Sequence, residues 1–96
     1  MEKIIFSDIL AHIDNSWSKL EKAKYIYTEI SKVCQYDKRF IYSSNSVLIN
    51  EIYNKKVDID TPVEPILICK SLNSVYSQLL NRIGIKNKTV ENAFSG

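Results

Sequence analysis

Three side chains in this chain of 96 residues could act as a nucleophile or as a base: Cys34, Cys69 and the single histidine, His12. A deprotonated thiol attacks carbonyl carbons, and an imidazole commonly serves as the base that activates it. Cys69 stands immediately before the clearest helical pattern in the chain, so we take it as the candidate nucleophile. Unpaired N–H groups at a helix N-terminus would stabilise both its thiolate and an oxyanion intermediate.

Each of these residues also has a purely structural interpretation. Free cysteines are among the most buried residues in proteins, so Cys69 equally fits a core thiol. Cys34 lies on the apolar stripe of a predicted helix, and we expect it in the core. For His12 a place on the surface or at a helix end is expected, ahead of a role as a base.

Composition excludes several classes of function. One histidine and two isolated cysteines cannot form a common zinc set, so we predict no metal and no cofactor. Thirteen basic and eleven acidic residues give a formal net charge of +2, which is too small to predict a nucleic-acid partner.

The cysteine content and the N-terminal residues indicate in which cellular compartment the protein is expected. Two well-separated cysteines favour free thiols in a reducing environment. The first residues lack the pattern of a signal peptide, and no apolar run has the length of a membrane span. We therefore expect a cytoplasmic protein without a membrane partner.

Apolar periodicity predicts two helices in the first third of the chain. A short amphipathic helix is expected over residues 4–13, where isoleucines recur every four residues. Ser18 and Glu21 form a capping-box pattern, which predicts a helix from about Lys19 to Cys34. Its expected core stripe consists of Leu20, Ala23, Tyr27, Ile30 and Cys34, with Ile26 and Val33 widening it.

The middle of the chain is expected to be less regular. Residues 35–46 are predicted to be a loop in which Tyr36 and Asp37 organise a turn. A shorter helix follows over residues 47–53. Two prolines make residues 58–65 a stiff connector, because each fixes its own φ and restricts the residue before it.

The last predicted helix, Ser71–Ile83, has a broad apolar stripe made of Leu72, Val75, Tyr76, Leu79, Leu80 and Ile83. Gly84 is expected to end it in the left-handed conformation, with Ile85 folding back onto the last turn. Residues 88–90 could begin a strand. The predicted fold is therefore a mainly α single or partial domain of three to four helices, with at most a short C-terminal strand.

Two segments, in this order and spacing, resemble the transglutaminase-like superfamily, which is related to papain-like cysteine peptidases. The first runs from Leu20 through Ala23 to the Tyr36-Asp37 pair, like the Lys-Ala helix that opens those domains. The second runs from Cys69 through the segment LLNRIGI at residues 79–85 to residue 90. The resemblance covers about residues 19–90 and implies the helical half of an α+β domain with Cys69 as nucleophile.

The same resemblance implies a histidine base and an Asp or Asn orienter after the helix, and neither follows here. Only six residues come after Val90, and His12 lies upstream of Cys69. Leu67 and Ile68 also stand where the family usually has a small residue near the cysteine. We therefore expect a truncated or partial cysteine acyl-transfer or peptidase domain that is inactive alone.

The alternative is a non-catalytic helical module for protein–protein interaction. Without the family's sheet, the apolar face of the last helix would need cover, because large exposed apolar patches are unfavourable. The expected partner is thus a protein or peptide, as a homodimer or as a second chain over that helix.

Overall fold

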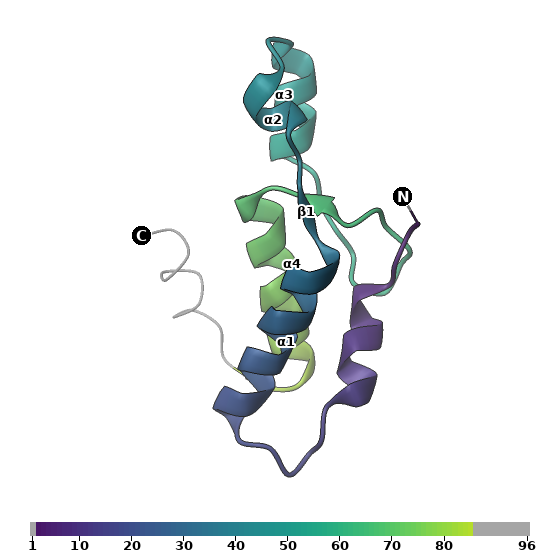
Figure 1. The fold of residues 1–96 in the computed structure, drawn as a ribbon, viewed down its shortest axis with the longest axis vertical. Coiled ribbons are helices and arrows are strands. Elements are labelled where there is room, and N and C mark those ends of the chain that lie inside the picture. The colour runs from purple at the N-terminus through teal and green to yellow at the C-terminus, as the bar shows by residue number, and fades with distance from the viewer. Residues whose placement is uncertain (1, 86–96) are drawn as a thin grey trace.

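The computed structural model describes residues 2–85 and confirms the mainly α fold class. In chain order the elements are the 3-10 helix η1 (Phe6–His12), α1 (Lys19–Val33), β1 (Gln35–Tyr36), α2 (Arg39–Tyr42), α3 (Ser46–Tyr53), β2 (Ile66–Leu67) and α4 (Cys69–Arg82). Figure 1 shows η1, α1 and α4 forming a body, with α2 and α3 projecting from one end of it. The strand predicted at residues 88–90 lies outside the described residues.

The body has one core, to which all three of its helices contribute. η1, α1 and α4 contact one another pairwise. The largest fully buried side chains are Phe6, Ile26, Ile30, Ile59, Val75, Leu79 and Leu80. Burial of this apolar surface is the main force that holds the three helices together.

The start of α1 confirms the predicted cap. Ser18 is the N-cap residue, and its Oγ accepts a hydrogen bond of 3.1 Å from the backbone N–H of Glu21. The Glu21 carboxylate accepts from the Ser18 hydroxyl at 3.3 Å, whereas in the usual capping box it would accept from the Ser18 backbone N–H. The local pattern thus places the first residue of α1 at Lys19, where it was expected.

The predicted core stripe of α1 is confirmed in part: Ala23 and Cys34 pack against the core, as expected. Ile26 and Ile30 are buried, whereas Leu20 is 64% exposed and Tyr27 is 43% exposed. Residues four apart lie on one line along a helix, and the line of Ile26 and Ile30 faces η1 and α4. Leu20 and Tyr27 lie to one side of that line, although the Tyr27 ring still packs on Tyr76 of α4, with ring centroids 5.7 Å apart.

The first predicted helix exists, but it is a 3-10 helix. It has three residues per turn, so its residues i and i+3 lie on the same face. Phe6, three residues before Ile9, is the fully buried residue, and Ile5 is only partly buried. The recurrence of isoleucine every four residues therefore failed to identify Phe6 as the core residue of this helix.

The prediction of a loop over residues 35–46 is wrong in part, because this stretch contains both β1 and α2. β1 pairs in parallel with β2, with Gln35 opposite Ile66 and Tyr36 opposite Leu67. The backbone N–H of Gln35 donates to the carbonyl of Pro65 at 2.8 Å. A strand of two residues has no periodicity of its own, and its hydrogen-bonding partner lies some thirty residues further along the chain.

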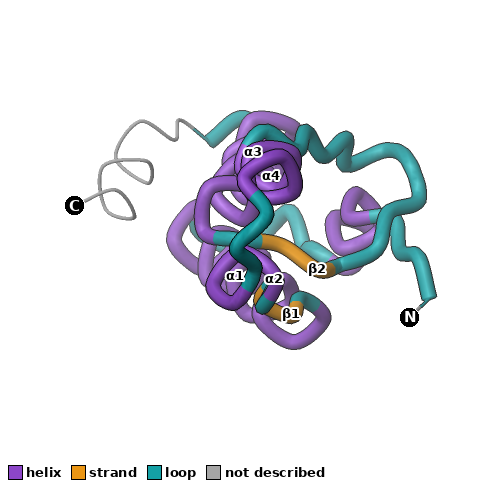
Figure 2. The backbone as a smooth tube through the Cα atoms, turned by 90° about the horizontal axis from the view of Figure 1, so that it is seen from above, coloured by secondary structure: helices purple, strands orange, loops and turns teal. Residues whose placement is uncertain are grey.

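The proline-containing connector ties the N-terminus to the body. Val63 forms an isolated antiparallel bridge with Ile4, through two backbone hydrogen bonds of 2.8 Å. The carbonyl of Ile59 also accepts from the N–H of Ser7, at 2.8 Å. Viewed from above, β1 and β2 lie between the helices and run side by side (Figure 2).

We call residues 38–56 the arm. Its two helices, α2 and α3, make their main contacts with each other. Phe40 stacks on Tyr53 with ring centroids 6.5 Å apart, and Ile52 of α3 is buried. The side chain of Asn45 caps α3 by accepting from the N–H groups of Val47 and Leu48, at 3.0 and 3.2 Å. These local contacts give the arm a defined shape.

α4 begins at Cys69, two residues before the predicted start, and ends as predicted. Gly84 has a φ of 80°, and the N–H groups of Gly84 and Ile85 donate to the carbonyls of Asn81 and Leu80, at 3.0 and 2.9 Å. This pair of bonds is the Schellman motif, and Ile85 packs against the core as expected.

The apolar face of α4 is covered within the chain, contrary to the reasoning that gave it a second chain as cover. Val75, Leu79 and Leu80 have no exposed surface. The Tyr76 hydroxyl donates to the carbonyl of Ala23 in α1 at 2.9 Å. The large apolar side chains that are exposed in the described residues therefore lie outside α4.

Candidate functional site

Cys69 is the first residue of α4, and a sharp turn from β2 presents it to solvent. Ser71 holds this turn, because its buried Oγ accepts from the N–H of Ile68 and donates to the Ile68 carbonyl, both at 3.0 Å. Cys69 itself is exposed. The interpretation of Cys69 as a buried core thiol is therefore wrong, whereas its predicted position at the head of the helix is confirmed.

Cys69 borders a small pocket of about 230 Å³ at the junction of the two strands, α1 and α4. Its walls include Ser31, Cys34, Tyr36, Leu67, Cys69 and Leu72. Both cysteines of the chain thus meet one pocket, which their separation in sequence did not predict. Cys34 is partly buried and packs against the core, as expected.

The two thiols differ in their environments. Burial raises the pKa of Cys34 to about 11, because the low-dielectric surroundings disfavour the thiolate. Cys34 is therefore a protonated, structural thiol at neutral pH. Cys69, in contrast, is exposed to solvent and is the first residue of α4.

His12 does not join Cys69. It is exposed on the last turn of η1, as expected for a surface residue, and it lines a different pocket. Among the described residues that line the Cys69 pocket there is no carboxylate and no imidazole. Lys70, the nearest cation in sequence, places its Nζ 3.9 Å from the ring centroid of Tyr53 on the arm. The described residues thus offer a thiol without a base.

The Tyr36-Asp37 turn is organised by Asp37, as predicted. Its buried carboxylate accepts from the backbone N–H of Arg39 at 3.1 Å, and from Nε and Nη2 of the same residue at 2.9 and 2.8 Å. These hydrogen bonds, opposed in part by burial, hold the pKa of Asp37 below its ordinary range. Asp37 is therefore a charged structural group that fixes the arm to β1.

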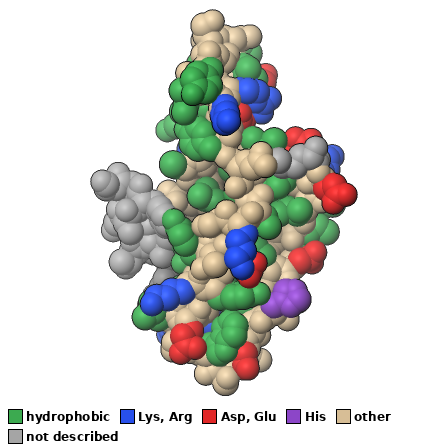
Figure 3. Space-filling model, viewed as in Figure 1, with side chains coloured by type: hydrophobic (Ala, Val, Ile, Leu, Met, Phe, Trp, Pro, Cys, Tyr) green, Lys and Arg blue, Asp and Glu red, His purple; other side chains and the backbone are tan. Residues whose placement is uncertain are grey.

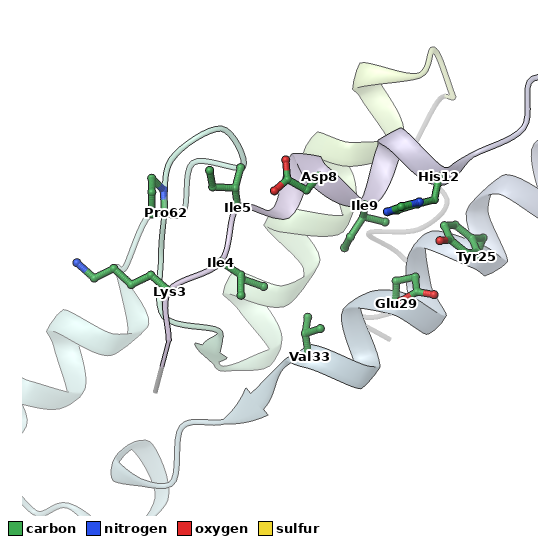
Figure 4. A pocket seen from close by; sticks show the side chains of 10 residues that line it. All are labelled: Lys3, Ile4, Ile5, Asp8, Ile9, His12, Tyr25, Glu29, Val33 and Pro62. Carbon is green, nitrogen blue, oxygen red and sulfur yellow. The ribbon is translucent and has the colours of Figure 1, made fainter.

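A larger pocket of about 510 Å³ lies between η1 and α1, and we call it the groove. Figure 4 shows Ile9 and His12 on η1 on the side of Glu29 and Val33 of α1, whereas Asp8 points from η1 toward the side of Ile5. The remaining lining comes from Lys3, Ile4, Ile5, Tyr25 and Pro62. The groove was not predicted, because it exists only where η1 and α1 pack side by side, and the pattern within each segment does not give their relative placement.

Within residues 2–85, no cluster of three or more His, Cys, Asp or Glu side chains is arranged to hold a metal ion. None of the helices in that part of the chain combines the length and the apolar character needed to cross a membrane.

Comparison of the chain with family models, with curated proteins and with solved structures gives no match. The resemblance to the transglutaminase-like superfamily therefore stays a prediction that rests on the residues quoted for it.

The difference between the two thiols is open to a direct test by alkylation with iodoacetamide. At pH 8 a thiol with a pKa of about 11 is only roughly 0.1% thiolate. In a Cys69→Ser variant we expect Cys34 to react about 100-fold more slowly than free cysteine, with a rate that rises tenfold per pH unit.

The matched variant, Cys34→Ser, should keep the fast labelling of the wild-type protein at Cys69. Fast labelling of Cys34 in the folded Cys69→Ser protein would contradict the burial described above.

Proposed function

We propose that this chain is a non-catalytic protein–protein interaction module whose arm binds a second protein chain. The observation that carries the proposal is the concentration of exposed apolar side chains on the arm. Of the eight large hydrophobic side chains that are exposed in the described residues, four lie there: Ile41, Tyr42, Val47 and Tyr53, at 60, 79, 65 and 49% exposure. Exposed apolar patches of this kind mark interaction sites.

The shape of the arm supports the same proposal. The stacking of Phe40 on Tyr53, the Asn45 cap and the Asp37–Arg39 pair order it in the free protein. A surface that is already ordered loses less conformational entropy when it binds. Tyr42 is the most exposed of the four, and tyrosine is one of the residue types enriched among those that carry most binding energy at interfaces.

A cysteine acyl-transfer activity is the second candidate. The position of Cys69, exposed at the first residue of α4 and beside a pocket, favours it. The missing base weighs against it, because a thiol without a base or another source of activation is a weak nucleophile. Rapid alkylation of Cys69 at pH 6, where an ordinary thiol is almost wholly protonated, would favour the enzyme. Two free thiols suit the cytoplasm as the proposed compartment.

Site-specific photocrosslinking tests the proposal in cells that naturally make the protein. A photoreactive phenylalanine analogue at position 42 should give one discrete crosslinked product, in which mass spectrometry identifies a defined second chain. The same analogue at position 20 is the matched control, because Leu20 is also exposed and lies on the body.

An Ile41→Ser substitution beside the probe should reduce the product, because apolar anchors carry much of the binding energy. Equal yields from positions 42 and 20, or no product at either, would refute the proposed role of the arm.

A further inference from the structure

The groove has an apolar floor and an acidic side chain on each wall. Ile4, Ile9 and Val33 belong to its apolar lining. Asp8 projects from η1 and Glu29 from α1, so the two helices each supply one carboxylate. Glu29 also forms an ion pair with Lys32 at 3.5 Å, in which the Lys32 side chain is 65% exposed. An exposed pair of this kind contributes little free energy, so Glu29 can still meet a second cation. Lys3, the basic residue of the lining, lies at the other end of the groove from Glu29 (Figure 4). The part of the groove between the two helices therefore favours a ligand that is apolar and cationic.

The arm exposes apolar side chains, like the groove, but its charged side chains are mostly basic. Ile41 and Tyr42 expose apolar surface at the end of α2. Over residues 37–56, the basic Lys38, Arg39, Lys55 and Lys56 outnumber the acidic Asp37 and Glu51. Arg39 and Asp37 pair with each other, and the remaining basic residues still outnumber the one acidic residue by three to one. Figure 3 shows Lys and Arg side chains beside the hydrophobic surface of the arm, and acidic side chains on the part of the body that carries the histidine.

We propose that the arm of one copy docks in the groove of a second copy. The inference rests on the proposed function, since it names the partner that the arm binds. The apolar side chains of Ile41 and Tyr42 would cover the floor of the groove, and Lys38 would face the carboxylates of Asp8 and Glu29. Burial of one aromatic side chain together with charge complementarity is the usual composition of a specific interface.

The contact must form between copies. The arm projects from one end of the body (Figure 1). The groove lies elsewhere, between η1 and α1. Two different surfaces then meet, so the contact is heterologous, and association continues head to tail until a ring closes or a chain of copies forms. This differs from a two-fold dimer, in which both copies would use the same surface.

Variants with reversed charges on the arm or on the groove distinguish this contact from association through other surfaces. The groove variant is Asp8→Lys with Glu29→Lys, and the arm variant is Lys38→Glu with Lys56→Glu. Lys55 is left in place because its Nζ donates to the carbonyl of Ile66. In sedimentation velocity, the wild-type protein should gain mass with concentration, and each variant alone should associate at least about tenfold more weakly, since like charges then face each other.

An equimolar mixture of the two variants should recover association. The reversed arm of one variant meets the reversed groove of the other, and the native arm meets the native groove, so both contacts are complementary in charge. Added salt should weaken association of the wild type, as screening predicts. Circular dichroism of each variant verifies folding, and Tyr42→Ser provides an uncharged arm variant that should also be monomeric.

A wild-type protein that stays monomeric at the highest concentration would overturn self-docking. The proposed function would survive that result if position 42 still crosslinked to a different protein. Association that neither charge variant weakens, or that the mixture does not restore, would also overturn the inference, because the contact would then lie on another surface.

Discussion

Replacing Leu79 by alanine is expected to lower the free energy of unfolding by about 3 kcal/mol, which lies within the range for buried leucines. Leu79 has no exposed surface and belongs to the core between α4, α1 and η1. Removal of its side chain loses apolar burial and leaves a cavity that the surrounding residues fill only in part. A domain of this size has a total stability of about 5–10 kcal/mol, so the loss is a large share of it.

Urea unfolding followed by circular dichroism measures this effect. The matched control is Leu20→Ala, because both leucines lie on the predicted apolar stripes of long helices and Leu20 is 64% exposed. The control should change stability by less than about 0.5 kcal/mol, as surface substitutions usually do. Equal losses for the two variants would contradict the packing of α1 and α4 described above.

Replacing Asp37 by asparagine should cost about 2 kcal/mol at pH 7, because it weakens hydrogen bonds to a charged guanidinium from a buried position. The pKa of Asp37 is lower in the folded chain than in the unfolded chain. Its charged form therefore stabilises the fold above the ordinary carboxyl pKa of about 4. This stabilisation is lost as the pH falls through the lower folded pKa.

The measurement is the difference in unfolding free energy between the wild type and Asp37→Asn at several pH values from 7 to 2. We expect this difference to shrink on acidification. Asp60→Asn is the matched control: Asp60 also pairs with an arginine, Arg82, but both side chains are about half exposed. Its cost should be clearly smaller than that of Asp37→Asn, because solvent screens an exposed ion pair. A difference for Asp37→Asn that did not change with pH would show that the charge of Asp37 is not what stabilises the turn.

The turn at Asp37 was easier to predict from the sequence than the ion pair that Asp37 forms with Arg39. The tendency of Asp37 to organise a turn follows from the residue type, and this prediction is confirmed. Its pairing with Arg39 was missed, although the two residues lie close in sequence. The pair depends on the rotamer of a long side chain and on the burial of Asp37 beneath the arm, which the local sequence does not indicate.

The sequence by itself determined the features that depend on contacts within about one helical turn. The Ser18 cap, the apolar stripe of α4 and the left-handed Gly84 with its returning Ile85 are all such features, and all were predicted. The position of Cys69 at the head of α4 was predicted for the same reason. Hydrogen bonds and steric limits between near neighbours are properties of the residue types involved.

Only the tertiary structure decided which of several apolar residues form the core, and which chemical groups meet. It buried Ile26 and Ile30 while Leu20 stayed exposed, and it paired Gln35 with Ile66. It also brought Cys34 and Cys69 to one pocket, placed His12 in another, and opened the groove between η1 and α1. These outcomes depend on how helices pack across tens of residues of chain, and periodicity within a single segment contains no information about its neighbour.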